Sequence, residues 1–161
     1  MENLLKTQKS LIISSLGKNG DPEISYAPFI MMNNKIYVYL SKVKSHYYNL
    51  RDNHKCSVLI IEDESKCTTI FARTRVSFNC EAKLLENVDE KIFKEFDENH
   101  DAKMMSMLKA MDFDMFELNI KDGVLVQGFG KASEVSIVDG EFKFTPIVSR
   151  PNSGNHGRVH N

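Results

Sequence analysis

The sequence has few of the features that mark disulfide-rich or metal-cluster proteins. Its 161 residues include only three cysteines, Cys56, Cys67 and Cys80. An odd number of cysteines, with no CxxC pair and no Cys/His cluster, argues against a disulfide framework and against a structural zinc site. We therefore expect buried, reduced thiols in a cytoplasmic protein.

The sequence also shows no long apolar run and no strong net charge, and we expect no signal peptide. No apolar stretch approaches the roughly 18 residues that a membrane helix needs. The first ten residues contain an early Glu2 and no basic region of the kind that opens a signal peptide. The formal net charge is −1, so no global field favours nucleic acid or anionic lipid. We expect one cytoplasmic domain that binds neither nucleic acid nor membranes.

Short apolar or alternating segments separated by turn residues run through most of the chain. They predict about eight strands, at residues 10–16, 23–31, 35–40, 55–61, 70–85, 113–120, 124–138 and 141–145. Asn33-Asn34 predicts a tight hairpin turn, and residues 121–123 predict a turn between two strands. So many short strands suggest a sandwich or a barrel, and closing a barrel removes the exposed strand edges.

Helices are expected at residues 2–9, at residues 44–53 and after Asn87, which can cap a helix with Glu90 reaching back. Beyond it, apolar residues recur at three- and four-residue steps and predict one interrupted helix or two short ones. The methionines of this stripe (Met104, Met105 and Met111) are expected to be core residues rather than metal or haem ligands.

Arg73 and Arg75 fall inside the predicted strand at residues 70–85. Residues two apart on a strand point to the same face. Arginine is seldom buried without a partner, so this face either meets solvent or offers two guanidinium groups to an anion.

The C-terminal segment, SRPNSGNHGRVHN, has little hydrophobic content and on composition alone predicts a disordered tail. We therefore divide the chain into a barrel domain at residues 1–148 and a tail at residues 149–161.

A series of segments in a fixed order carries a family resemblance. The segments are SYAPF (25–29), SHYYNL (45–50), LIIEDES (59–65), IFARTRVSF (70–78), MDFDMFEL (111–118), VQGFGKA (126–132) and the histidine-bearing tail. Together they resemble the HugZ/HutZ family of haem-utilisation proteins. This family is a branch of the split β-barrel fold otherwise known from flavin-binding, pyridoxamine-phosphate-oxidase-like proteins. The resemblance implies a mainly β homodimer that binds haem b near the subunit interface.

The resemblance also assigns roles to individual residues. It implies that a tail histidine binds the haem iron, and we prefer His156, which glycines flank, to His160, which lies next to the chain end. It points to Asp112 as the carboxylate that orients this ligand, with Asp114 two residues further on. A carboxylate on the second imidazole nitrogen fixes the tautomer and raises basicity.

Two arginines and a further histidine complete the predicted site. The resemblance places Arg75 close to haem, where a guanidinium can hold a propionate or donate to a bound ligand. Arg73 is the second candidate, with the alternative of a structural ion pair to Glu62 or Glu64. His46 stands where flavin-binding relatives carry a basic residue for the flavin phosphate, and it either touches a propionate or caps its helix.

Three functions remain open from the sequence. The first is a haem oxygenase that degrades haem, as both substrate and cofactor, to a biliverdin-type product and releases iron, using an unidentified electron donor. The second is a non-catalytic haem storage or transfer protein. The third is a flavin-dependent oxidoreductase with FMN, which needs a basic phosphate cradle that is not evident at residues 44–51.

Overall fold

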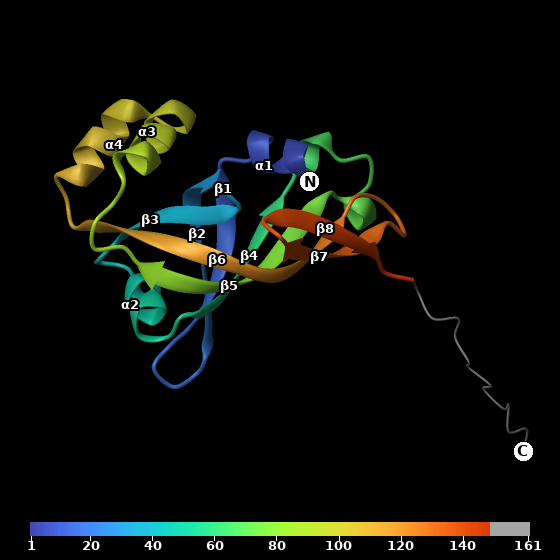
Figure 1. The fold of residues 1–161 in the computed structure, drawn as a ribbon, viewed down its shortest axis with the longest axis horizontal. Coiled ribbons are helices and arrows are strands. Elements are labelled where there is room, and N and C mark those ends of the chain that lie inside the picture. Colours follow the sequence, from blue (N-terminus) through green and yellow to red (C-terminus); the bar gives the residue numbers. More distant parts are fainter. Residues whose placement is uncertain (149–161) are drawn as a thin grey trace, which may run out of the picture.

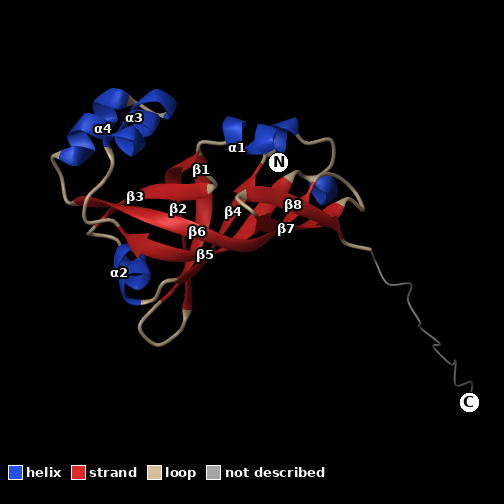
Figure 2. Ribbon diagram, in the orientation of Figure 1, coloured by secondary structure: helices blue, strands red, loops and turns tan. Residues whose placement is uncertain are grey.

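The computed structural model describes residues 1–148, which form a β-barrel with short helices at its ends (Figures 1 and 2). The helices are α1 (Glu2–Thr7), α2 (Ser45–Asp52), α3 (Glu90–Asn99) and α4 (Ala102–Lys109). The strands are β1 (Ser10–Leu16), β2 (Pro22–Met32), β3 (Lys35–Ser41), β4 (Lys55–Ile61), β5 (Arg75–Leu84), β6 (Phe113–Val126), β7 (Ala132–Val138) and β8 (Glu141–Pro146).

Six strands close into a barrel, and the other two extend it. The strand order is β3-β2-β1-β4-β5-β6-β7-β8, and β3 also pairs with β6, which closes the ring from β3 to β6. Each pairing between neighbours is antiparallel. The β7–β8 hairpin continues the sheet beyond β6 (Figure 1). The predictions of eight strands and of a closed barrel are confirmed for this part of the chain, with six of the strands forming the barrel.

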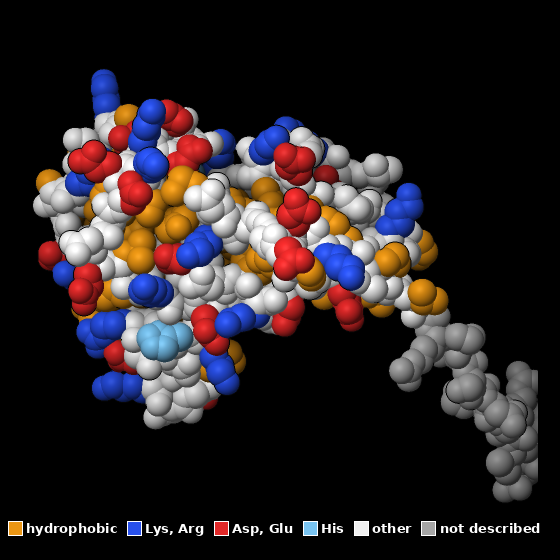
Figure 3. Space-filling model, viewed as in Figure 1, with side chains coloured by type: hydrophobic (Ala, Val, Ile, Leu, Met, Phe, Trp, Pro, Cys, Tyr) orange, Lys and Arg blue, Asp and Glu red, His pale blue; other side chains and the backbone are white. Residues whose placement is uncertain are grey.

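The barrel core follows from the alternation of the strands. Inward-facing side chains are almost completely buried, among them Ile13, Ile60, Val76, Phe78 and Phe116. A second, smaller cluster lies outside the barrel, where α3 and α4 cover Ile30, Tyr37 and Met115. Figure 3 shows hydrophobic side chains between this helical hairpin and the barrel. Both faces of β3 are therefore covered.

The tight turns follow the predicted residue chemistry. Asn33 and Asn34 both adopt positive φ (53° and 60°) between β2 and β3, which confirms the predicted hairpin. Asp101 caps α4, and its side chain accepts hydrogen bonds from the backbone of Lys103 and Met104. The predicted cap of α3 is wrong. Asp89, not Asn87, caps this helix by accepting from the backbone of Lys91, because Asp89 directly precedes the first helical residue.

Three strand assignments also differ from the prediction. The predicted strand at residues 124–138 is interrupted, because residues 124–126 belong to β6 and β7 begins at Ala132. β5 begins at Arg75, since residues 70–72 form a turn of 3₁₀ helix. The predicted turn at residues 121–123 is instead the middle of β6, which runs unbroken from Phe113 to Val126 past a register shift opposite Asn79 and Cys80. Gly123 serves close packing there, because a Cβ would lie 2.4 Å from the Ser77 carbonyl oxygen and 2.6 Å from the Phe78 ring.

The methionine stripe divides between core and surface. Met105 is buried, but Met104, Met107 and Met111 are about half exposed or more. The expectation that the stripe is plain core therefore holds for Met105 and is wrong for Met104 and Met111, because α4 packs through only one of its faces.

Candidate functional site

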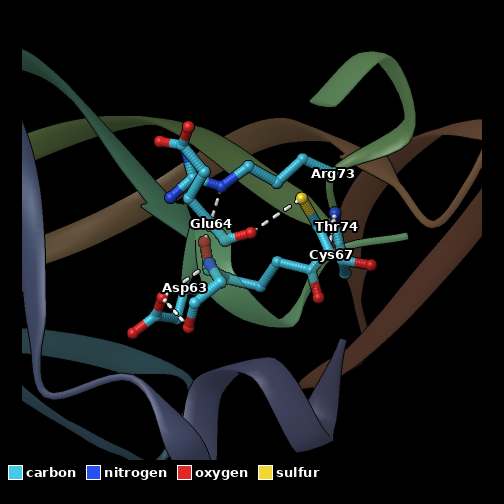
Figure 4. Close-up of polar contacts among 7 residues, drawn as sticks. Asp63, Glu64, Cys67, Arg73 and Thr74 are labelled. Atoms are coloured by element: carbon cyan, nitrogen blue, oxygen red, sulfur yellow. Dashed lines mark hydrogen bonds and ion pairs between the residues drawn. The ribbon is translucent and has the colours of Figure 1, made fainter. Parts of the chain in front are cut away.

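Arg73 lies in the corner between β4 and β5, not on a strand (Figure 4). Its Nε donates to the Glu62 carbonyl oxygen at 2.7 Å, and its Nη1 lies 3.9 Å from the Glu64 carboxylate. The predicted ion pair with Glu64 is confirmed. The expectation that Arg73 shares a strand face with Arg75 is wrong, because the 3₁₀ turn ends at Ala72 and Arg73 turns towards the acidic corner.

Arg75 is the first residue of β5, opposite Ile61 on one side and Val126 on the other. Its neighbour Val76 is fully buried, so the Arg75 side chain points out of the barrel. Within residues 1–148, its guanidinium makes one hydrogen bond, from Nη1 to the Arg73 carbonyl oxygen at 2.9 Å, and no ion pair. Most of its donors can therefore meet another partner.

Asp112 and Asp114 lie at the opposite end of β6. Asp112 is exposed and just precedes the strand, and its carbonyl oxygen accepts from the Lys42 backbone N–H at 2.9 Å. Asp114 is engaged more tightly, because its carboxylate accepts a short hydrogen bond from the Tyr47 hydroxyl and lies 3.5 Å from Lys42 Nζ. Of the two aspartates, Asp112 has the freer carboxylate.

Tyr47, Asp114 and Lys42 form a polar cluster, and the sequence did not reveal Tyr47 as a member of it. Burial, together with the hydrogen bond to Asp114, raises the pKa of Tyr47 to about 12. The cluster ties α2 to the start of β6 and thereby holds the neighbouring His46 and Asp112 in place. No local signal marks it, because the two partners are far apart in the sequence.

Replacing Tyr47 by phenylalanine tests this cluster. We expect a loss of about 1–2 kcal/mol in the free energy of unfolding at pH 8, because the hydrogen bond to a carboxylate is removed. In the wild type the folded state keeps the Tyr47 proton to about pH 12, while the unfolded state releases it near pH 10. Between these values the unfolded state binds fewer protons, so stability falls as pH rises.

Urea unfolding at pH 9 and pH 11.5 measures this difference. Tyr47→Phe should lose less stability over this interval than the wild type, by up to about 2 kcal/mol. Tyr48→Phe, which alters the exposed neighbour, is the matched control and should follow the wild type. Identical pH dependence of wild type and Tyr47→Phe would contradict the raised pKa.

His46 lies in the first turn of α2 and is buried, and its Nδ1 has no hydrogen-bond partner within residues 1–148. Burial, reinforced by Lys44, lowers the pKa of His46, which keeps the ring neutral near pH 7. The alternative that His46 caps its helix is wrong, because Lys44 occupies the cap position and no side chain caps it.

His54 and His100 differ in how far their side chains are buried. His54 is exposed, as its polar sequence context indicates. His100 has a similarly polar context, which suggests a surface residue, but it is half buried, stacks on Phe96, and lies with Nε2 2.8 Å from the Phe29 carbonyl oxygen. It therefore anchors α3 to β2. His156 and His160 lie outside the described residues.

The predicted site residues gather at two distant ends of one barrel. Arg75 pairs with the last residue of β6, whereas Asp112 precedes its first residue, and the 14 residues between them span roughly 40 Å of strand. The helix α2, which carries His46, is held at the Asp112 end by the hydrogen bond from Tyr47 to Asp114. The last described residues, around Ile147, lie at the Arg75 end of the barrel. The Ile147 N–H donates to the Ala132 carbonyl oxygen, and Ala132 pairs with Val126, which is the residue opposite Arg75.

Two clefts, of about 700 and 690 Å³, flank α1. Neither is lined by any of the predicted site residues. Up to residue 148, no group of three or more His, Cys, Asp or Glu side chains is arranged to hold a metal ion. No helix in the same part of the chain is long and apolar enough to cross a membrane.

The six-strand closed barrel extended by a hairpin places the protein among the split β-barrels of the pyridoxamine-phosphate-oxidase type. The model of the pyridoxamine 5'-phosphate oxidase family matches residues 1–127. The chain belongs to this family and, within it, to the HugZ/HutZ branch, which confirms the resemblance found in the sequence.

Three comparisons define this branch. The chain is 31% identical, over 132 residues, to the haem oxygenase HutZ of Vibrio cholerae, which covers 80% of this chain and 75% of the relative. The crystal structure of Campylobacter jejuni ChuZ matches with a TM-score of 0.80 and 27% identity over 91% of this chain. The chain spans 60% of the length of ChuZ. A structure of HutZ described as the haem storage protein of V. cholerae matches with a TM-score of 0.67 and 27% identity, covering 74% of this chain and 87% of HutZ.

Proposed function

We propose that this protein binds haem as a homodimer and degrades it oxidatively to a biliverdin-type product with release of iron. The observation that carries the proposal is the 31% identity to the haem oxygenase HutZ, together with an outward-facing Arg75 that has unused donors. Haem would be both substrate and cofactor, and an electron donor that we do not identify would supply the reducing equivalents.

The residues around Arg75 fit such a ligand. Two loops border this end of the sheet, one before Arg75 and one after Val126, and each exposes a phenylalanine, Phe71 and Phe129. Haem is a flat apolar ring with carboxylate groups on one edge. Exposed aromatic side chains beside a free guanidinium offer both the apolar contact and the charge that such a molecule needs.

The tail histidines can reach this end of the barrel. Ile147 lies three strand spacings from Arg75, or about 14 Å. The nine residues from Ile147 to His156 can span roughly 30 Å when extended. His156 as the iron ligand, with His160 as the alternative, is therefore compatible with a ring bound beside Arg75.

Asp112 cannot complete that site within the same subunit, because β6 separates it from Arg75. We propose that a second copy supplies it. Three apolar side chains, Ile24, Tyr26 and Val124, are exposed on the outer face of the sheet formed by β2, β1, β4, β5 and β6. The strand registers place Tyr26 and Val124 in one row across these strands. Pairing two barrels through this face would bury the apolar row and bring Asp112 of one subunit towards Arg75 of the other.

In this dimer each residue has a defined task. Arg75 would hold a haem propionate or donate a hydrogen bond to another anionic group there. Asp112 accepts from the Nδ1–H of the histidine ligand and thereby fixes its tautomer. His46, neutral because its pKa is lowered by burial, has a free Nδ1 that can exchange one hydrogen bond with a propionate. The oxidative chemistry itself is supplied by the haem when it is bound.

A second candidate is haem storage without degradation, which the description of HutZ as a haem storage protein favours. The same histidine and Arg75 would serve both functions. The flavin alternative with FMN is supported less well, because the residue at the expected phosphate position, His46, is buried and its pKa is lowered.

Haemin titration followed by absorption spectroscopy tests the proposal, with ascorbate added in air as a second step. We expect a sharp Soret band at one haem per subunit and its bleaching after ascorbate. His156→Ala should weaken haem binding at least tenfold, whereas His160→Ala and the exposed control His54→Ala should not. A stable band after ascorbate would favour storage, and a protein that is purified yellow and gives no Soret band would favour FMN.

A further inference from the structure

We propose that Cys56 and Cys80 form a modification site at which a peroxide converts two thiols into a disulfide. Cys56 lies on β4 and Cys80 on β5, and the strand register sets them directly opposite each other. The proposal does not depend on haem binding, since it rests on the barrel alone.

The backbone spacing suits a disulfide. The Ala82 N–H donates to the His54 carbonyl and the Glu62 N–H to the Thr74 carbonyl, so these pairs are hydrogen-bonded pairs. In an antiparallel ladder, hydrogen-bonded and non-hydrogen-bonded pairs alternate along the strands. The register between β4 and β5 is unbroken, and Cys56 lies an even number of residues from both His54 and Glu62, so Cys56 and Cys80 also form a hydrogen-bonded pair. Such pairs have a Cα separation of about 5.5 Å, within the range that disulfides adopt, and their Cβ atoms, also about 5.5 Å apart, must move about 1 Å closer for the bond to form.

Both side chains also point to the same side of the sheet. Cys56 shares its face with Val58, and Cys80 shares its face with Phe78, and these are inward-facing core residues. Cys80 is buried in the barrel core, and Cys56 packs against that core while partly exposed. The Cys56 thiol already leans across to β5, where it donates to the Cys80 carbonyl oxygen at 3.8 Å.

The surroundings of the two sulfurs assign them different roles. The pKa of Cys56 is lowered by its side-chain contact with Cys80, whereas the pKa of Cys80 is raised by the same contact and by burial. Cys56 is thus both the more accessible sulfur and the one that ionises first. It is the attacking thiol, and Cys80 is the resolving thiol.

The reaction proceeds in two steps with hydrogen peroxide as the oxidant. The Cys56 thiolate attacks one peroxide oxygen, an S–O bond forms, the O–O bond breaks, and hydroxide leaves and takes up a proton to form water. The Cys80 sulfur then attacks the sulfenic sulfur, the S–S bond forms, and a second water leaves with the Cys80 proton. Two thiols are oxidised and one peroxide is reduced to two waters.

The third cysteine provides a matched control. Cys67 is half exposed, and its thiol donates to the Glu64 carbonyl oxygen at 3.0 Å in the corner that follows β4. It has no cysteine opposite it in the strand register. A generally oxidisable thiol would react at Cys67 as well, whereas a built dithiol site would not involve it.

The test treats the reduced full-length protein with a small excess of hydrogen peroxide. Free thiols are then counted in denaturant, and intact and peptide masses are measured. We expect the wild type to lose two of its three thiols, to lose about 2 Da, and to give a peptide linked through Cys56 and Cys80. Cys67→Ser should behave identically and form the same link.

The single variants distinguish the two roles. Cys56→Ser should form no disulfide, and Cys80→Ala should stop at a sulfenic acid on Cys56 that dimedone traps. Far-UV circular dichroism establishes whether each variant is folded. If Cys80→Ala does not fold, the link between Cys56 and Cys80 in Cys67→Ser still decides the test. Three free thiols after treatment, oxidation confined to Cys67, or a link that includes Cys67 would overturn the proposal.

Discussion

Replacing Gly123 by alanine should lower the free energy of unfolding by about 3 kcal/mol, the largest effect that we expect from adding one methyl group to this protein. A Cβ at this position would lie 2.4 Å from the Ser77 carbonyl oxygen and 2.6 Å from Cδ1 of Phe78. Real Cβ atoms do not approach so closely. The Ser77 oxygen belongs to β5, and Phe78 is fully buried in the barrel core, so neither can move without disturbing packed structure.

Gly17→Ala is the matched control. A Cβ there would make ordinary contacts, with nothing closer than 3.4 Å. We expect its free energy of unfolding to stay within about 0.5 kcal/mol of the wild type or to rise slightly, because alanine reduces the entropy of the unfolded chain. Urea unfolding of the two variants measures the difference. If Gly123→Ala were as stable as Gly17→Ala, the close approach of β5 and β6 would be wrong.

A dimer assembled from one Arg75→Ala subunit and one Asp112→Asn subunit should degrade haem at about half the wild-type rate, while both parent homodimers should be nearly inactive. If each site combines Arg75 of one subunit with Asp112 of the other, the mixed dimer keeps one intact site and places both substitutions in the second. Loss of a preorganised donor such as Arg75 typically costs about 100-fold or more in rate. Loss of a carboxylate that orients a metal ligand costs about 10- to 100-fold.

A second mixed dimer distinguishes a site shared between subunits from a site within one subunit. A wild-type subunit paired with an Arg75→Ala/Asp112→Asn double variant contains the same four side chains in a different distribution. In a shared site both of its centres are damaged, so it should be nearly inactive. Differently tagged subunits, copurified and assayed for haem bleaching with ascorbate, give both rates. The opposite pattern, with activity only in the wild-type and double-variant pair, would show that each site belongs to one subunit.

The predicted strands agree with the structure wherever hydrophobic alternation and turn residues point the same way. β3 and β8 begin at the predicted residues, because alternating side chains follow specific turn residues, Asn33-Asn34 before β3 and Asp139-Gly140 before β8. The prediction fails at Gly123, where a glycine between two apolar segments suggests a turn. Its real role, close packing against Phe78, depends on a strand more than forty residues earlier in the chain.

In the candidate site, too, features that depend on neighbouring residues were predicted, and contacts between distant segments were not. The motifs in the sequence identified the family and singled out Arg75, Asp112 and His46, and the family is confirmed. They offered Glu64 as one of two partners for Arg73, and the structure bears this out. They could not indicate that Tyr47 holds Asp114, because this contact joins segments that only the closed barrel brings together.

The sequence by itself determined the strand and helix pattern, the hairpin turns and the family, because each of these depends on residues that are close together along the chain. The tertiary structure decided the length of β6, the pairing of Cys56 with Cys80, and the separation of Arg75 from Asp112. These features depend on strand register, which is set by the packing of distant side chains in a common core.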